Sequence, residues 1–204
     1  NVTPDSFSDG NEEKDWRDLE PKVDTMIRAG VHIIDVGGES TRPGATPVTP
    51  MTEWQRIEPV LAALKKPGRR QRLAPLISVD TYHAETARRA LDIGADIIND
   101  VSGLCSPEMI DLAASSRTDW IAMHSLSIPV DRKHVLPVGS DSYTEVERWL
   151  TQRLELWDKA GLDLERIIFD PGVGFGKDSL QSLQLLKQVG HFRRHGLRIL
   201  VGHS

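Results

Sequence analysis

Six short apolar runs recur along the 204-residue chain, and stretches with helical periodicity separate them. Each run is short and rich in β-branched residues, so each is predicted to be a strand that is buried on both faces of a sheet. Regular alternation of strands and helices indicates βαβ units and therefore a parallel sheet. The six runs are Ile33–Val36, Leu76–Val79, Ile97–Ile98, Trp120–Met123, Ile167–Phe169 and Ile199–Val201.

Between the runs, apolar residues recur three and four positions apart, which is the spacing of one helix face. Glycines at positions 30, 94, 161 and 190 are expected to end helices, and Pro107 is expected to begin one. The predicted faces are Val23, Met26 and Ile27; Trp54, Ile57, Leu61 and Leu64; Ala87, Ala90 and Leu91; Met109, Leu112 and Ala113; Tyr143, Val146, Leu150, Leu154 and Trp157; and Leu180, Leu183 and Leu186.

The strand count favours an α/β fold of the (β/α)8 barrel type, trimmed at both ends and forming one domain over residues 1–204. A seventh strand is expected to end just before Asn1, and a further βα unit is expected after Ser204. The chain is therefore interpreted as an excerpt of a longer protein, since complete barrels have about 250 residues. An open doubly wound sheet is the alternative architecture.

Charge and cysteine content narrow the class of protein. The formal net charge is −5, which gives a nucleic-acid role no electrostatic support. No apolar run approaches the length that spans a membrane. The single cysteine, Cys105, has no partner within the chain, so nothing points to an oxidising compartment and a cytoplasmic location is expected. Cys105 is predicted to be a small buried residue rather than a catalytic thiol.

Polar side chains stand at the ends of three predicted strands, at Asp80, Asn99 and Asp170. In parallel α/β folds the binding site lies at the carboxyl ends of the strands. A lone Asp there is commonly the N-cap of the next helix, but Asn99 and Asp170 do not directly precede helices. A carboxylate accepts two parallel hydrogen bonds from the amino-amide edge of a heterocycle, and an Asn offers a donor and an acceptor. The three residues are therefore predicted to grip a polar ring.

Two further segments follow predicted strands. Arg42 is suited to a phosphate or carboxylate, although a surface arginine in a turn is an equal alternative. The glycine loop 170–178 is neither a Walker P-loop nor a dinucleotide fingerprint, and its glycines are predicted to let the backbone approach a ligand. The irregular stretch Leu126–Ser142 is interpreted as either a surface insertion or an active-site loop.

The seven histidines show no metal-ligand spacing. Two of them, His124 and His203, follow predicted strands, and their role is left open. The others are predicted to be surface or packing residues: His32, His83, His134, His191 and His195.

Six segments resemble, in the same order, the signature motifs of the dihydropteroate synthases, a family of pterin-binding enzymes. The resemblance covers the whole chain, and six ordered motifs are far more specific than any one of them. It implies a (β/α)8 barrel that joins p-aminobenzoate to 6-hydroxymethyl-7,8-dihydropterin pyrophosphate, giving 7,8-dihydropteroate and pyrophosphate for folate biosynthesis. The segments are Asn1–Gly10, Gly38–Gly44, Ser78–Thr81, Ile98–Val101, Met123–His124 and Asp170–Lys177.

The resemblance also implies roles for individual residues. Asp80, Asn99 and Asp170 are expected to hold the amino-pyrimidine edge of the pterin, with Met123 among the substrate-binding residues. Arg42, Asp80 and Asp170 are expected to be the catalytic residues. Further roles are expected for Asn1 as a ligand of Mg²⁺, Thr41, Arg42 and Pro43 on a loop that closes over the substrates, and Phe7 and Ser204 at the p-aminobenzoate site.

Small-molecule substrates and a homodimer are the partners that the resemblance implies, without nucleic acid or membrane. The family is expected to supply a pterin-binding lysine and an Arg-x-His anion site from residues beyond Ser204. The stretch 125–142 departs from the family's glycine-containing pattern. The alternatives are a pterin-binding methyltransferase domain, which does not account for the Thr41–Pro43 segment, and a catalytically silent pterin-binding homologue.

Overall fold

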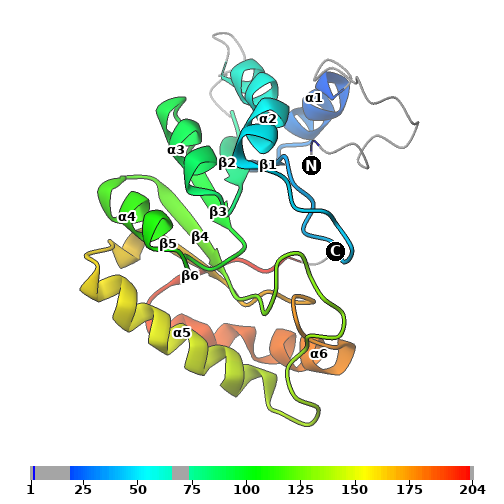
Figure 1. The fold of residues 1–204 in the computed structure, drawn as a ribbon, viewed down its shortest axis with the longest axis vertical. Coiled ribbons are helices and arrows are strands. Elements are labelled where there is room, and N and C mark those ends of the chain that lie inside the picture. Colours follow the sequence, from blue (N-terminus) through cyan, green and yellow to red (C-terminus); the bar gives the residue numbers. More distant parts are fainter. Residues whose placement is uncertain (1, 3–18, 66–73, 203–204) are drawn as a thin grey trace. The chain divides into compact units, whose positions relative to one another are not determined.

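The structure is a computed structural model, and it describes residues 2, 19–65 and 74–202. Its contacts divide the chain into two compact units, which are described separately. The first comprises the described residues up to Ser40 and from Pro47 to Ile98, and the second comprises Thr41–Thr46 and the described residues from Asn99 onward. Along these residues strands and helices alternate as predicted (Figure 1).

The first unit contains α1 (Glu20–Arg28), β1 (Ile33–Gly37), α2 (Pro50–Leu64), β2 (Leu76–Asp80) and α3 (Ala84–Asp92). β1 and β2 are parallel neighbours whose register runs from the pair Ile33 and Leu76 to the pair Gly37 and Asp80. The Thr49 side chain caps α2, and the predicted face of this helix is buried at Trp54, Ile57, Leu61 and Leu64.

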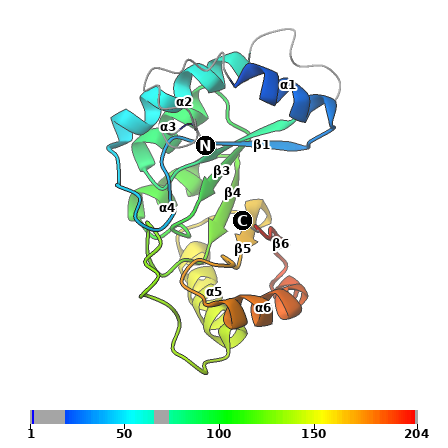
Figure 2. The same ribbon diagram turned by 90° about the vertical axis from the view of Figure 1, so that its right-hand side faces the viewer.

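The second unit begins within β3 (Ile97–Asp100) and continues with α4 (Pro107–Ser115), β4 (Asp119–Met123), α5 (Ser142–Lys159), the 3-10 helix η3 (Leu164–Arg166) and β5 (Ile167–Asp170). It ends with α6 (Ser179–Gln188), the 3-10 helix η4 (Val189–His195) and β6 (Arg198–Ile199). β4, β5 and β6 pair in parallel in sequence order. Helices α5 and α6 lie side by side (Figures 1 and 2).

All six predicted strands are present, but two details of the prediction are wrong. β6 ends at Ile199, although the Leu200 N–H still donates to the Phe169 carbonyl oxygen at 2.9 Å. β1 is not buried on both faces, because Ile33 and Asp35 are exposed whereas Ile34 and Val36 are buried. Alternate side chains of a strand point to opposite faces, and α1 and α2 cover only the face that carries Ile34 and Val36.

The predicted face of α6 is also wrong. Leu180 is 78% exposed and Leu183 is 49% exposed, whereas Gln181 and Leu185 are buried. The reason is polar: Gln181 completes a capping box with Asp178, and its amide donates to the carbonyl oxygens of Leu136 and Pro137. These bonds turn the Gln181 side of the helix inward.

Glycine and cysteine predictions had mixed outcomes. Gly30, Gly94 and Gly161 follow helices with left-handed backbone, as predicted, but the chain passes through Gly190 and makes that turn at Gly196. Cys105 is exposed rather than buried, because Leu104 takes the interior position just before α4 begins. Within the described segments, no helix has both the length and the apolar character needed to cross a membrane.

Candidate active site at the strand ends

Asp80 ends β2, and its Cα pairs with that of Gly37 at the end of β1. It is half-buried, and it lies at the carboxyl end of two parallel strands, where the sequence places it. The next residue, Thr81, is buried, and its hydroxyl donates to Oε2 of Glu53 at 2.7 Å. The buried Glu53 of α2 therefore fixes the chain directly after the end of β2.

A second buried glutamate organises the segment after β1. Oε1 of Glu39 accepts a hydrogen bond of 2.5 Å from the Tyr82 hydroxyl, and Oε2 lies 2.9 Å from Nε2 of His83. Burial and the Glu39 carboxylate together raise the pKa of Tyr82 above its usual range. Glu39 thus joins the segment that follows β1 to the segment that follows β2. The sequence analysis did not assign Glu39 a role, although its position between a strand end and Arg42 could have indicated a role near the site.

Glu53 of α2 is buried and keeps one carboxylate oxygen, Oε1, without a hydrogen-bond partner in the described part of the chain. Burial is the main cause that raises the pKa of Glu53. The Glu53 backbone also explains Gly38, because a Cβ on Gly38 would lie 2.7 Å from the Glu53 carbonyl oxygen. The predicted Gly38–Gly44 segment therefore begins with a close helix contact.

In the second unit, Met123 ends β4 and Asp170 ends β5, and their Cα atoms are register partners. Oδ1 of Asp170 accepts the Gly172 N–H at 2.8 Å, and the Gly202 N–H also donates to this carboxyl group. Burial raises the pKa of Asp170 to about 6. The Gly172 N–H and the charge of Lys177 oppose this rise, because both favour the ionised carboxylate. Asn99 is the half-buried third residue of β3. Asp80 and Asp170 end their strands as predicted, whereas Asn99 lies one residue before the end of β3.

The neighbouring Asp100 has an internal role. It is fully buried, Oδ1 accepts the Ser102 N–H at 2.7 Å, and Oδ2 accepts the Leu104 N–H at 3.0 Å. Burial raises the pKa of Asp100 to about 6. This carboxyl group shapes the turn after β3, where Leu104 adopts a positive φ of 52°.

Lys177 is the residue that sequence analysis most clearly missed. It is buried, and its Nζ lies 2.6 Å from Nδ1 of His124 and 3.1 Å from the His124 carbonyl oxygen. It also donates to the carbonyl oxygens of Gly172 at 2.9 Å and Phe175 at 3.0 Å. Burial and the Lys177 charge lower the pKa of His124 to about 3, so its ring is neutral. The sequence left the role of His124 open, and in the structure its ring is buried and packs against Trp149.

Two glycines after β5 closely approach other parts of the protein, and the predicted approach of this loop to a ligand stays a prediction. A Cβ on Gly172 would lie 1.9 Å from the His124 carbonyl oxygen, and one on Gly176 would lie 2.6 Å from the Leu126 side chain. Gly174 is the exception in this loop, because a Cβ there would meet no atom within 4 Å. The physical reason is that β4 and β5 end side by side, so their loops compete for the same space.

The Arg42 segment belongs to the second unit. Arg42 and Pro43 are exposed, Thr41 is half-buried, and the Ala45 N–H donates to the Arg42 carbonyl oxygen at 3.1 Å. The Val130 N–H donates to the Thr41 carbonyl oxygen at 3.1 Å. Further along, the Leu136 N–H donates to the Gly176 carbonyl oxygen at 2.9 Å. The stretch 126–142 therefore contacts two predicted site segments, which favours the interpretation as an active-site loop.

Three predicted site residues, Asn1, Phe7 and Ser204, lie outside the described residues, as does His203. Within residues 19–65 and 74–202, no group of three or more His, Cys, Asp or Glu side chains is arranged to hold a metal ion. The predicted role of Asn1 as a ligand of Mg²⁺ stays a prediction.

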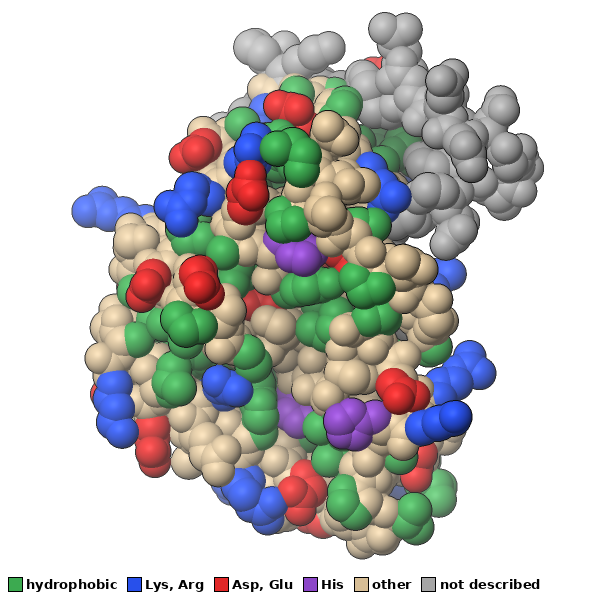
Figure 3. All heavy atoms as spheres, viewed as in Figure 1, with side chains coloured by type: hydrophobic (Ala, Val, Ile, Leu, Met, Phe, Trp, Pro, Cys, Tyr) green, Lys and Arg blue, Asp and Glu red, His purple; other side chains and the backbone are tan. Residues whose placement is uncertain are grey.

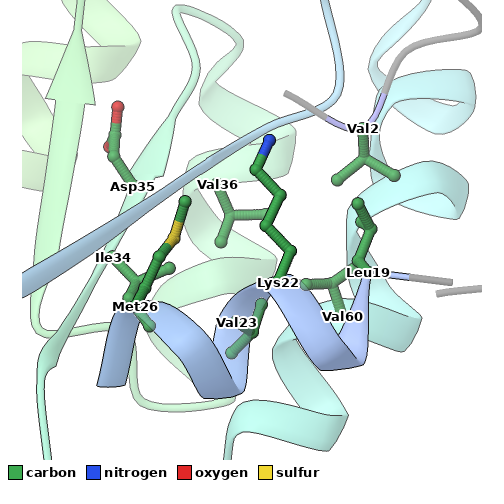
Figure 4. Close-up of a pocket in the computed structure, with 9 residues that line it drawn as sticks. All are labelled: Val2, Leu19, Lys22, Val23, Met26, Ile34, Asp35, Val36 and Val60. Carbon is green, nitrogen blue, oxygen red and sulfur yellow. The ribbon is translucent and has the colours of Figure 1, made fainter. Parts of the chain in front are cut away.

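Figure 4 shows a recess in the first unit, between α1, α2 and β1. Its lining is mainly apolar, with Lys22 and Asp35 as the charged members, and it contains none of the predicted site residues. On the face drawn in Figure 3, acidic and basic side chains lie interspersed, without a basic stripe of the kind that tracks nucleic acid. The strand ends therefore remain the candidate site.

Within the second unit, the structure brings Met123, His124, Asp170 and Lys177 together at the ends of β4 and β5. Asp80 lies in the first unit, so its action together with Asn99 and Asp170 stays a prediction.

A model of the family described as "Pterin binding enzyme" matches residues 1–204. The chain is 45% identical over its full length to a probable bifunctional folylpolyglutamate synthase/dihydropteroate synthase of Halobacterium salinarum, of which it covers 24%. It is 40% identical over its full length to a dihydropteroate synthase of Synechocystis sp., of which it covers 69%. The chain therefore spans only part of each relative.

A solved structure of Yersinia pestis dihydropteroate synthase with a sulfonamide drug complex is similar over the whole chain and over 72% of that protein. The TM-score is 0.87 and the sequence identity is 35%. This similarity confirms the predicted α/β-barrel fold and excludes the open doubly wound sheet.

Proposed function

The chain belongs to the family of pterin-binding enzymes, and from this premise we propose that it forms the pterin-holding part of a dihydropteroate synthase. The proposed reaction joins p-aminobenzoate to 6-hydroxymethyl-7,8-dihydropterin pyrophosphate. The observation that carries the proposal is that the chain matches, over its own full length, relatives that are named dihydropteroate synthase or bifunctional folylpolyglutamate synthase/dihydropteroate synthase.

The geometry of Asp170 supports the proposal. The carboxylate is buried at the end of a parallel strand, and it accepts hydrogen bonds from the backbone N–H groups of Gly172 and Gly202. A fixed, buried carboxylate is suited to accept two hydrogen bonds from an amino-pyrimidine edge. On the family resemblance alone, Asp80 at the end of β2 and Asn99 one residue before the end of β3 are proposed to take part in holding the pterin.

The proposed chemistry needs no protein nucleophile. The bond between the pterin methylene carbon and the pyrophosphate oxygen breaks, and the oxygen keeps the electron pair. The aniline nitrogen of p-aminobenzoate forms the new bond to that carbon and releases one proton. Positive charge develops on the methylene during this exchange, and an ionised Asp170 in a site closed to water favours that charge.

Arg42 is proposed to neutralise the leaving pyrophosphate, because a guanidinium binds phosphate oxygens in a bidentate manner. Thr41 and Pro43 would act with it, and Phe7 and Ser204 would contact p-aminobenzoate. The hydrogen bond from Val130 to Thr41 supports a defined conformation at the start of this segment.

Mg²⁺ is proposed as a cofactor on the resemblance alone, with Asn1 as its protein ligand. When bound, the ion would neutralise charge on the pyrophosphate oxygens. The homodimer and the cytoplasmic location are likewise proposals, and size-exclusion chromatography with light scattering of the full-length protein tests the first.

The test is a pyrophosphate-release assay on the full-length parent protein with both substrates and Mg²⁺, with and without a sulfonamide. We expect release that depends on p-aminobenzoate and that the sulfonamide suppresses. Asp80→Ala is expected to abolish pterin binding in calorimetry, whereas Asp92→Ala, an exposed position on α3, leaves it unchanged. Release without p-aminobenzoate, or unchanged affinity in Asp80→Ala, contradicts the proposal.

A further inference from the structure

Lys177 lies at the point where the loops after β4 and β5 meet. Its Nζ has four acceptors within 3.1 Å, and all of them belong to these two loops. From the loop after β4 come Nδ1 and the carbonyl oxygen of His124. From the loop after β5 come the carbonyl oxygens of Gly172 and Phe175. A single buried side chain therefore holds both loops.

The number of acceptors indicates the charge of Lys177. An ammonium group has three N–H donors and no acceptor, whereas a neutral amine has two donors and presents a lone pair. Four surrounding acceptors therefore fit the ammonium form. Burial lowers the pKa of Lys177 to about 7, and the charge of Asp170 opposes that shift.

Lys177 is connected to Asp170 by two short paths. Gly172 accepts from Lys177 through its carbonyl oxygen and donates to Oδ1 of Asp170 through its own N–H. His124 bonds to Lys177 through its ring and donates its backbone N–H to the Asp170 carbonyl oxygen at 2.9 Å. Gly172 and His124, two of the residues that bond to Asp170, are thus both held by Lys177.

We propose that Lys177 is a positioning residue, which orients the Asp170 carboxylate through Gly172 and His124 and keeps it ionised for pterin binding. This inference rests on the proposed function, since the pterin is the ligand that Asp170 would hold. Neither the family resemblance nor the glycine-loop pattern assigns Lys177 such a role.

The groups that face Asp170 define how its charge responds to pH. The loop after β4 contributes the His124 backbone N–H and a ring that is neutral, β6 is followed by the Gly202 N–H, and the loop after β5 contributes Lys177. Lys177 is the positive charge that opposes protonation of Asp170 in this set. Without it, the carboxyl group would protonate at a higher pH.

The first experiment measures by calorimetry the affinity of the full-length protein for 6-hydroxymethyl-7,8-dihydropterin. The measurements run from about pH 5.5 to about pH 8.5, a range that includes the pKa of Asp170 at about 6 and that of Lys177 at about 7. Lys177→Met keeps an unbranched side chain, one atom shorter, but removes the charge and all donors. Lys187→Met, at an exposed position of α6, is the matched control.

In Lys177→Met we expect the acid limb of the affinity profile to move upward by about one pH unit, as for the loss of a nearby opposite charge. The affinity deficit should approach tenfold near pH 5.5, should be about threefold near pH 6.5 and should narrow toward pH 8.5, where Asp170 is ionised in both proteins. Lys187→Met should follow the wild-type profile. A deficit of equal size at every pH, or no deficit, overturns the proposal.

A second measurement keeps the proposal testable if Lys177→Met does not fold. NMR titration of ¹⁵N-lysine in the wild-type protein should show Lys177, assigned through Lys177→Arg, titrating well below the ordinary lysine pKa of about 10.4. Asp170→Asn should lower the Lys177 pKa further, because the two charges stabilise each other. Titration of Lys177 at the ordinary lysine value, or no response to Asp170→Asn, refutes the coupling. This readout needs no ligand, so it separates a failure of this inference from a failure of the proposed function.

Discussion

Nζ of Lys177 lies 2.6 Å from Nδ1 of His124, so a buried ammonium joins the ends of two neighbouring strands. The same Nζ donates to the carbonyl oxygen of Gly172, whose N–H orients Asp170. The candidate site of the second unit is therefore built from backbone groups that one buried charge holds in place. Substitutions that disturb this arrangement should lower stability or activity, and the matched control substitutions should not.

The close approach of the two loops predicts a large difference between neighbouring glycines. Gly172→Ala places a Cβ 1.9 Å from the His124 carbonyl oxygen at a φ of +66°, and we expect a loss of about 3 kcal/mol or more in the free energy of unfolding. Gly174→Ala has a similar φ of +84° but meets no atom within 4 Å, so it should lose only about 1 kcal/mol. Urea denaturation of both variants measures the difference, and equal losses would contradict the packing described for Gly172.

Asp100 predicts a specific pH dependence of stability. Its pKa is about 6 in the folded protein, against about 3.9 in an unfolded chain. The carboxyl group therefore favours the folded state below pH 4, and this contribution is lost as the pH rises through 6. Relative to Asp100→Asn, which does not titrate, the wild type should lose about 2–3 kcal/mol of stability between pH 4 and pH 7. Denaturation curves at both pH values test this, and a constant difference between the two proteins would show that the buried carboxyl group is not responsible.

Glu39 is predicted to stabilise the first unit through its charge. Glu39→Gln replaces a carboxylate that bonds Tyr82 and His83 with a neutral amide, which removes the charge from both contacts, and we expect a loss of about 1–3 kcal/mol. Glu58→Gln, at an exposed position of α2, should stay within about 0.5 kcal/mol of the wild type. Thermal unfolding of the pair gives the comparison, and a Glu39→Gln protein as stable as its control would argue against this network.

Arg42 is predicted to act on turnover rather than on pterin binding. Arg42 is exposed in a segment that the Val130 N–H holds at Thr41, and its proposed partner is the leaving pyrophosphate. Arg42→Ala should lower kcat about 100-fold, as the loss of one electrostatic group does, and should change the pterin Kd less than about threefold. Arg117→Ala, at an exposed position after α4, serves as the control. Equal losses in kcat and in pterin affinity would count against this role.

Periodicity was sufficient to predict the strands and the ends at which Asp80, Asn99 and Asp170 lie, because buried parallel strands require continuous apolar runs. It was also sufficient for α2, whose predicted face is buried throughout. It failed for α6, where the buried side is set by hydrogen bonds from Gln181 to Leu136 and Pro137, residues more than 40 positions away.

Lys177 could not be assigned from the sequence for a similar reason. A lysine after a glycine loop is normally interpreted as exposed or phosphate-binding. The burial of Lys177 depends on the ring and the carbonyl group of His124, 53 residues earlier. Cys105 shows the converse, since a residue type that is commonly buried lies exposed where Leu104 fills the interior position. Long-range polar contacts, rather than local pattern, decide these positions.

The most direct test of the account is the rate at which the full-length protein forms 7,8-dihydropteroate from the two proposed substrates, compared between Asp170→Asn and Asp178→Asn. Asp178 caps α6, a role that Asn fills equally well, so this variant should retain the wild-type rate. Asp170→Asn should lose about 100-fold, the effect of removing two charge-assisted hydrogen bonds of about 1.5 kcal/mol each. A wild-type protein that forms no dihydropteroate, or an Asp170→Asn protein as fast as Asp178→Asn, would contradict the account.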